Sequence, residues 1–256
     1  MNNKLTQLFQ QKNSNLLNVY CTAGYPKKES TATVLSTLQK NGVDIIEIGM
    51  PYSDPIADGP VIQKSNMQAL QNGMTIELLF TQLNDAKSTI NIPIILMGYL
   101  NPVLQFGIEK FCEAAAAAGV SGIILPDLPM YEYEEMYSGI FKKHNLCFIF
   151  LITPQTSAER IKKADELSSG FLYAVSSSAT TGTTANAEDK QAYFERIAAM
   201  KLNNPLMIGF GINDNATYEN ACSYASGAII GSAYIKALAT VDDIEHATET
   251  FLKTIR

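Results

Sequence analysis

The chain has 256 residues, of which 46% are hydrophobic, 17% charged and 9% aromatic. This composition supplies enough apolar side chains for one sizeable core and excludes a disordered tail or a coiled coil. Nineteen Lys and Arg residues against 25 Asp and Glu residues give a net charge of −6, which argues against nucleic acid or an anionic membrane as the partner.

The beginning of the chain and its cysteines indicate a reduced, cytoplasmic compartment. Met1–Ser14 is polar and amphipathic and lacks the apolar segment that a secretory signal needs. No apolar run approaches the roughly 18 residues needed to cross a bilayer. The cysteines show no CxxC spacing and lie far apart in apolar segments, which is typical of reduced core thiols rather than disulfides or zinc ligands. They are Cys21, Cys112, Cys147 and Cys222.

Short apolar runs of β type alternate with amphipathic segments of helical length along the chain. The eight predicted strands are Leu17–Tyr20, Asp44–Gly49, Pro93–Tyr99, Gly122–Asp127, Cys147–Thr153, Phe171–Ser177, Pro205–Gly211 and Gly227–Ala233. The eight predicted helices are Lys28–Asn41, Thr75–Thr89, Ile108–Ala118, Tyr131–His144, Ser157–Leu167, Glu188–Lys201, Asn213–Tyr224 and Val241–Ile255. This alternation predicts an α/β fold, a single (β/α)8 TIM barrel over residues 1–256 with an extra N-terminal helix. A doubly wound open sheet is the alternative.

Two local patterns refine this prediction. Gly42, Gly119 and Gly227 each precede a predicted strand, and each is expected to end a helix there. The segment Ser176–Lys190 is polar, rich in small residues and follows the sixth predicted strand, where a barrel carries functional loops. It is interpreted either as a lid over the site or as a plain connection.

The active site of a barrel lies at the C-terminal ends of its strands, so the titratable residues there are the candidates for chemistry. They are Glu47, Asp54, Asp58, Tyr99, Asp127 and Tyr173. Both histidines, His144 and His246, fall in predicted helices, and no strand end carries a lysine. A His-ligated metal site or a Schiff base is therefore not expected, and carboxylates are predicted to carry the proton transfers.

Two carboxylates of different character flank the second predicted strand. The period of two places Glu47 on one face with Ile45 and Gly49, so burial should raise its pKa and make it a general acid/base. Asp58 lies in the Pro-rich loop Met50–Pro60, which is stiff enough to fix a carboxylate that orients a substrate N–H. The alternatives are a buried structural glutamate and an ordinary turn aspartate.

Glycines near the end of the chain indicate a phosphate site. Ile208–Ile212 and Ile230–Ala233 follow the last two predicted strands, where backbone N–H groups approach a ligand closely. Ser232 can donate a further hydrogen bond, and a short helix from Ala233 would direct its positive end at the anion. The alternative is that these glycines only form tight turns between strand and helix.

The segment Asp44–Gln63, DIIEIGMPYSDPIADGPVIQ, resembles the signature of the tryptophan synthase α subunit family. Further resemblance follows in family order over nearly the whole chain, at Thr22–Pro26, Leu96–Pro102, Pro126–Pro129, Gly209–Ile212 and Gly231–Ala233. The resemblance implies a (β/α)8 lyase that acts in tryptophan biosynthesis, which is part of aromatic amino-acid biosynthesis. Its reaction is the retro-aldol cleavage of indole-3-glycerol phosphate to indole and glyceraldehyde 3-phosphate, without a cofactor or metal in this chain.

The resemblance also implies roles for individual residues. Glu47 matches the acid/base that protonates indole C3, and Asp58 matches the carboxylate that holds the indole N–H. The implied substrate-binding residues are Tyr99, Leu125 or Leu128, Tyr173, Thr181 and Phe210, and the implied phosphate-binding residues are Gly182, Gly211, Gly231 and Ser232.

The family works with a pyridoxal-phosphate-dependent β subunit, which implies an αββα heterotetramer in which indole passes through a tunnel. The loop Pro51–Pro60 and the pair Asn101–Pro102 resemble the contact surface. One departure lies in the sixth loop, where Ser177 and Ala179 replace the family's usual Arg and Gly while Thr181 remains. Two other functions stay open: a different phosphate-binding barrel enzyme, such as an isomerase or cyclase, and a non-catalytic activator of a β subunit.

Overall fold

The computed structural model describes residues 1–175, 187–209, 211–239 and 242–256. Within these ranges nine strands form one parallel sheet in the order β5-β4-β3-β2-β1-β9-β8-β7-β6. The strands are β1 (Leu16–Thr22), β2 (Ile45–Gly49), β3 (Ile94–Met97), β4 (Gly122–Ile124), β5 (Cys147–Phe148), β6 (Leu151–Ile152), β7 (Leu172–Val175), β8 (Leu206–Gly209) and β9 (Gly227–Ile230).

The sheet closes into a barrel through its two end strands. The single strand predicted at Cys147–Thr153 is split into β5 and β6, which pair with β4 and β7 respectively. On one side the Ile149 N–H donates to the Ile123 carbonyl, and on the other the Tyr173 N–H donates to the Phe150 carbonyl, both at 3.0 Å. The split strand therefore bridges both neighbours, and the predicted (β/α)8 barrel is confirmed.

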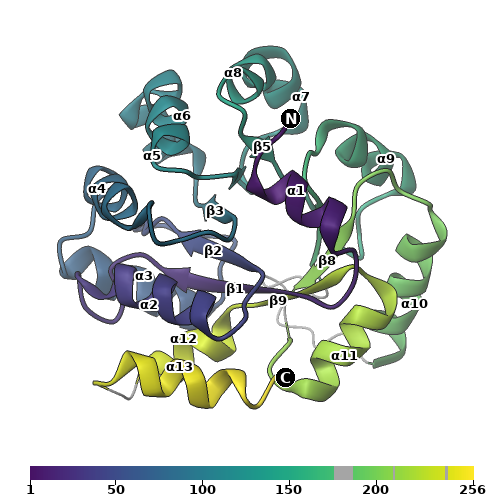
Figure 1. Cartoon of the computed structure of the whole chain (residues 1–256). Coiled ribbons are helices and arrows are strands. Elements are labelled where there is room, and N and C mark those ends of the chain that lie inside the picture. The colour runs from purple at the N-terminus through teal and green to yellow at the C-terminus, as the bar shows by residue number, and fades with distance from the viewer. Residues whose placement is uncertain (176–186, 210, 240–241) are drawn as a thin grey trace.

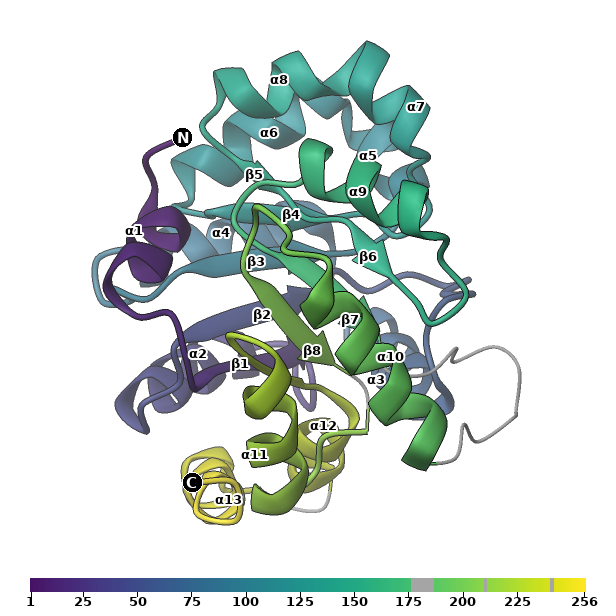
Figure 2. The ribbon, with the colours of Figure 1, turned by 90° about the vertical axis from the view of Figure 1, so that its right-hand side faces the viewer.

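Most helices surround this ring on the outside, while the first lies across one of its ends (Figures 1 and 2). They are α1 (Lys4–Gln11), α2 (Ser30–Lys40), α3 (Pro60–Gln71), α4 (Ile76–Ala86), α5 (Leu100–Phe106), α6 (Ile108–Ala117), α7 (Met130–Glu132), the π-helical turn η1 (Tyr133–Tyr137), α8 (Ser138–Lys143), α9 (Ala158–Leu167), α10 (Ala187–Ala199), α11 (Asn215–Tyr224), α12 (Ser232–Leu238) and α13 (Ile244–Leu252). None of the helices in the described ranges is long and apolar enough to span a bilayer.

Several helix boundaries differ from the sequence prediction. The helix predicted over Tyr131–His144 is interrupted by η1, and α3 and α5 were not predicted. Gly42 and Gly119 have φ of +79° and +82° and follow α2 and α6, as expected for glycines that end helices. Gly227 does not end a helix. It lies inside β9, and a side chain on it would collide with the backbone carbonyl of Leu16 on the neighbouring strand.

Helix α1 closes the N-terminal end of the barrel. Its Leu5 is fully buried in the cluster inside the ring, which also contains Cys147 and Phe171. The Asn3 side chain caps α1 by accepting the backbone N–H groups of its first turn, and its Nδ2 donates to the Ser121 carbonyl just before β4. The opposite, C-terminal end of the barrel carries the loop that follows β2.

Candidate active site

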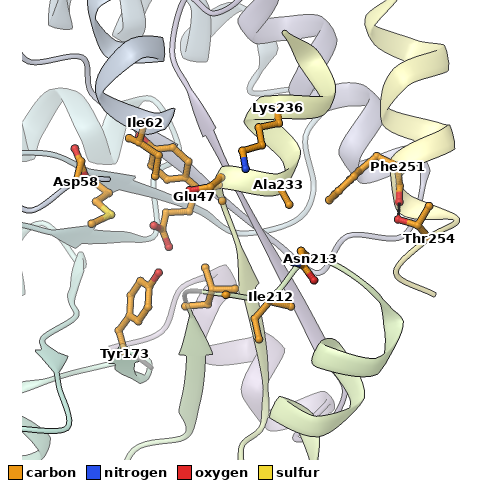
Figure 3. Close-up of a pocket in the computed structure, with 16 residues that line it drawn as sticks. Glu47, Asp58, Ile62, Tyr173, Ile212, Asn213, Ala233, Lys236, Phe251 and Thr254 are labelled. Carbon is orange, nitrogen blue, oxygen red and sulfur yellow. Dashed lines mark hydrogen bonds between the residues drawn. The ribbon is translucent and has the colours of Figure 1, made fainter. Parts of the chain in front are cut away.

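A cavity of about 450 Å³ lies at the C-terminal end of the barrel (Figure 3). Six of the predicted site residues line it: Glu47, Asp58, Tyr173, Gly211, Gly231 and Ser232. They come from β2, the loop after β2, β7, the segment after β8, and the junction of β9 and α12. Segments nearly 190 positions apart in the chain thus meet at one site, because parallel strands of a barrel all end on the same side.

Glu47 lies in the middle of β2, opposite Tyr20 of β1, and only 1% of it is exposed. Burial, with a smaller contribution from the nearby Asp58 charge, raises the pKa of its carboxyl to about 8. A hydrogen bond of 3.1 Å from the Asn18 amide to Glu47 Oε2 opposes the rise. The burial and the raised pKa are those predicted from the alternation of β2.

Asp58 occupies the loop between β2 and α3 and is half-buried. Burial raises the pKa of its carboxyl to about 6, while hydrogen bonds from Tyr99 and Asn66 lower it. The Asp58 backbone N–H donates to the Pro55 carbonyl at 3.1 Å, so the residue also stands in a turn. The turn interpretation and the site interpretation are therefore compatible, since the turn presents the carboxylate to the cavity.

The two carboxyl groups differ in protonation between pH about 6 and about 8. In that range Glu47 retains its proton and Asp58 is an anion. A neutral acid beside a fixed carboxylate can protonate one atom of a ligand while binding a positively polarised N–H of the same ligand. Figure 3 shows the Glu47 carboxyl and the Tyr173 hydroxyl directed toward each other from β2 and β7.

The Tyr173 ring fits only because Gly209 of β8 lacks a side chain. A Cβ at Gly209 would lie 2.5 Å from the Tyr173 ring and hydroxyl, far inside ordinary contact distance. Gly49 and Tyr20 form the same kind of pair on the neighbouring strands. Glycines at the strand ends therefore leave room for the aromatic side chains that line the cavity.

We expect Gly209→Ala to displace the Tyr173 ring, to lower turnover about tenfold and to lower the thermal unfolding midpoint by several degrees. Gly139→Ala is the matched control, because a Cβ at this exposed position of α8 meets nothing within 4 Å. Turnover and thermal unfolding of both variants check this. Wild-type behaviour of Gly209→Ala would show that the ring is not confined by β8.

The far end of the cavity has the features predicted for an anion site, and a cation that was not predicted. Gly211, with φ of +79°, lines the cavity together with Gly231 and Ser232. Lys236 also lines the cavity, one helical turn after Ser232 on α12. The spacing of four between Ser232 and Lys236 predicts that both lie on one face of the helix, so the sequence alone indicates Lys236 as a neighbour of Ser232.

The structure does not bring every predicted residue to this cavity. Leu125 lies in the apolar cluster between sheet and helices, whereas Ile124 before it points inside the ring. Together with Leu128, Leu125 lines a separate cavity of about 320 Å³ that Arg160 also lines. Neither residue lines the cavity that contains Glu47 and Asp58, and their role as walls of the indole site stays a prediction.

Tyr99 acts on the site from outside the cavity. Its hydroxyl accepts the Ala57 backbone N–H at 3.0 Å and is hydrogen-bonded to Asp58. Its ring packs on Tyr52, with ring centroids 5.3 Å apart. Tyr99 therefore holds the loop that carries Asp58 rather than lining the space for a ligand.

Three predicted residues, Thr181, Gly182 and Phe210, lie outside the described residues, as does the stretch 176–186 of the predicted lid. Among the residues that are described, no three His, Cys, Asp or Glu side chains gather where they could share a metal ion.

Comparisons with known proteins agree with one another. Residues 6–256 match the family model described as tryptophan synthase alpha chain. The chain is 50% identical over 255 residues to the tryptophan synthase alpha chain of Parabacteroides distasonis, with 99% of each covered, and 51% identical over 237 residues to that of Flavobacterium psychrophilum, with 92% and 93% covered.

Solved structures show the same likeness. A crystal structure of tryptophan synthase subunit alpha from Legionella pneumophila superposes with a TM-score of 0.90 at 33% identity, covering 100% of this chain and 97% of that one. A chain of the aminoacrylate-bound tryptophan synthase from M. tuberculosis gives 0.86 at 30% identity, with 100% of each covered.

Proposed function

The chain belongs to the tryptophan synthase alpha chain family, and from this premise we propose that Glu47 and Asp58 carry out the family's lyase reaction here. The enzyme acts in tryptophan biosynthesis and cleaves indole-3-glycerol phosphate to indole and glyceraldehyde 3-phosphate. The observation that carries the assignment of residues is that Glu47 and Asp58, two carboxyl groups whose pKa values are raised to different extents, line one cavity together with Gly211 and Gly231.

In the proposed binding mode the indole ring occupies the barrel end of the cavity. Met97 and Ile229 supply apolar contacts there, and Tyr173 lies across from Glu47. The phosphate lies toward Gly231 and Ser232, where backbone N–H groups and the Ser232 hydroxyl can donate to it. Thr181, Gly182 and Phe210 remain proposed contacts from the family resemblance.

The reaction needs one proton delivered and one removed. Glu47 donates its proton to indole C3, which makes the ring nitrogen electron-poor. The Asp58 carboxylate accepts a hydrogen bond from the ring N–H, which has become more acidic. Glu47, now an anion, takes the proton of the side-chain hydroxyl. The hydroxyl oxygen becomes the aldehyde carbonyl oxygen as the carbon–carbon bond breaks. The electron pair of that carbon–carbon bond moves into the indole ring.

This chemistry explains a site built from carboxylates. The protonated indole itself accepts the electron pair of the broken bond, so the step requires neither a Schiff-base lysine nor a Lewis acid. We accordingly propose that the chain needs no cofactor of its own and that pyridoxal phosphate belongs to a partner β subunit.

A β subunit is the proposed partner, in an αββα heterotetramer, and the exposed loops near the cavity support this. Ile56, in the loop after β2, is 74% exposed, and Leu104 of α5 is 44% exposed. Large exposed apolar side chains close to a site are typical of interfaces. Ile56 lies in Pro51–Pro60 and Leu104 lies two residues after Asn101–Pro102, the two segments that resemble the family's contact surface.

The test is release of indole from indole-3-glycerol phosphate by the purified chain, alone and with a β subunit. We expect slow release that the β subunit accelerates. If folded protein releases no indole under either condition, the proposed assignment of residues is wrong. If Glu47→Gln still stimulates a β subunit fully while wild type itself cleaves nothing, the chain is an activator instead.

A separate prediction concerns Lys236, the cation that lines the phosphate end. Lys236→Met should raise KM about three- to tenfold and leave kcat within twofold, because an exposed charge contributes equally to binding of substrate and transition state. Lys162→Met on α9 is the control, an exposed lysine far from the cavity. Steady-state kinetics at low and high salt checks this, and an unchanged KM at low salt would exclude Lys236 from phosphate binding.

A further inference from the structure

Asn18 contacts the proposed general acid from inside the barrel wall. It lies on β1, is completely buried, and its Nδ2 donates to Glu47 Oε2 at 3.1 Å. It does not line the cavity, so it touches Glu47 and not a ligand. Its own carbonyl oxygen, Oδ1, is buried and has no hydrogen-bond partner among the described residues.

An unpaired buried amide oxygen is unfavourable, and proteins rarely retain one without a reason. Here the orphaned oxygen belongs to the same amide group that holds Glu47. Rotation of that amide by half a turn about its terminal bond exchanges Oδ1 and Nδ2. After the rotation a hydrogen-bond acceptor, instead of a donor, faces Glu47.

We propose that Asn18 is a positioning residue that holds the Glu47 carboxyl in both of its protonation states by turning its amide over. When Glu47 is an anion, Nδ2 donates to the carboxylate. When Glu47 carries its proton, Oδ1 accepts the carboxyl O–H. The inference rests on the proposed lyase function, in which Glu47 alternates between these states in every turnover.

An amide meets a requirement that an apolar or a cationic side chain at position 18 does not. A leucine of similar shape offers neither donor nor acceptor, and a lysine or arginine would offer donors only. A carboxyl group that changes protonation inside a buried site would lose its partner in one state unless that partner can serve both roles. The match between Asn18 and a reversible acid/base at Glu47 is therefore chemical as well as geometric.

The other titratable groups near Glu47 do not change protonation in the pH range where the Glu47 carboxyl itself titrates. Burial raises the pKa of Tyr20 and Tyr173 well above 10 and that of Cys21 to about 12, so these groups keep their protons. Asp58 has its pKa at about 6 and is already ionised above pH 7. Among these groups, a carboxyl titration above pH 7 thus belongs to Glu47.

The test follows the Glu47 carboxyl directly by carbon-13 NMR of protein labelled at glutamate side-chain carboxyls. The Glu47 signal is identified as the one that Glu47→Gln removes. Asn18→Leu removes the bond to Glu47 in both states, and because the bond to the anion is the stronger one, the midpoint should rise by about one pH unit. Asn18→Ser, whose hydroxyl is too short to replace the amide, should give a shift in the same direction if the leucine variant folds poorly.

Kinetics and infrared spectroscopy separate the two halves of the proposal. Asn18→Leu should lower kcat about tenfold with KM within twofold, since Asn18 positions the acid without touching substrate. Below the midpoint, the carbonyl stretch of protonated Glu47 should differ between wild type and Asn18→Leu, because its O–H loses the Oδ1 acceptor. An identical stretch would overturn the role of Oδ1, and an unchanged midpoint would overturn the role of Nδ2.

Thr37→Val is the matched control. Its hydroxyl is buried on α2 and donates to the Thr33 carbonyl at 2.8 Å, outside the ring. It should lower stability without moving the Glu47 midpoint. The NMR and infrared measurements require no substrate, so a shifted midpoint in a protein that cleaves no indole-3-glycerol phosphate would support Asn18 and reject the proposed reaction.

Discussion

Glu47→Gln is expected to lower kcat for indole release by 10³-fold or more while the barrel stays folded. The carboxyl is buried, and burial keeps its pKa at about 8, so at neutral pH the wild type has a proton to give. A glutamine has nearly the same shape but neither donates nor accepts a proton in the reaction. Steady-state kinetics with purified protein checks this, with circular dichroism as the measure of folding.

The control for this variant is Glu159→Gln, an exposed glutamate in the first turn of α9. It should retain wild-type turnover. If Glu47→Gln keeps more than about a tenth of the wild-type kcat, Glu47 is not the acid, and a buried structural role becomes the better interpretation.

The same substitution should have an effect on stability that depends on pH. Between pH about 4.5, the unperturbed pKa, and about 8, the folded state holds the Glu47 proton and the unfolded state has lost it. The folded state therefore binds more protons, so this group makes the free energy of unfolding fall as pH rises through that interval. Glu47→Gln removes this titration, and its unfolding midpoint should exceed that of wild type by more at pH 8 than at pH 4.5.

Asp58→Asn is expected to lower kcat/KM about 10²- to 10³-fold. The charge on Asp58 becomes most valuable when C3 is protonated and the indole nitrogen turns electron-poor, so the loss falls mainly on the transition state. An asparagine still accepts a hydrogen bond from the N–H but supplies no negative charge. We therefore expect most of the decrease to appear in kcat, measured over a full range of substrate concentrations.

Asp54→Asn is the matched control for Asp58, because Asp54 lies in the same loop, is exposed and does not line the cavity. In the isolated chain it should have wild-type kinetics. A pure KM effect of Asp58→Asn, with kcat unchanged, would contradict the assignment and reduce Asp58 to a ground-state binding residue.

Sequence pattern predicts the barrel and the chemistry of β2 well. Strands that are apolar on both faces and alternate with amphipathic helices leave few architectures other than a parallel barrel. The alternation places the glutamate on one face of the strand with Ile45 and Gly49, because a strand turns every second residue to the same side, and the structure shows that Ile45 on this face packs inside the ring. The loop that carries Asp58 was found through its prolines, which limit its conformations.

What the sequence could not supply depends on tertiary contacts. Whether Leu125 reaches the cavity depends on how the three-residue strand β4 before it pairs with β3 and β5, which no local pattern shows. Asn18 and Glu47 are 29 positions apart in the sequence, and no local sequence pattern predicts the hydrogen bond between them. Tyr99 lies beside the predicted site, yet only the three-dimensional loop shows that it binds Ala57 and Asp58 instead of lining the cavity.

The central claim, that a protonated Glu47 starts the cleavage, is tested most directly by the pH dependence of kcat/KM for wild-type indole release. The account predicts that kcat/KM falls as pH rises through about 8, the pKa of the Glu47 carboxyl. In Asn18→Leu this fall should occur at a correspondingly higher pH. Activity that stays constant or increases from pH 7 to pH 9.5 would show that Glu47 does not act as the acid.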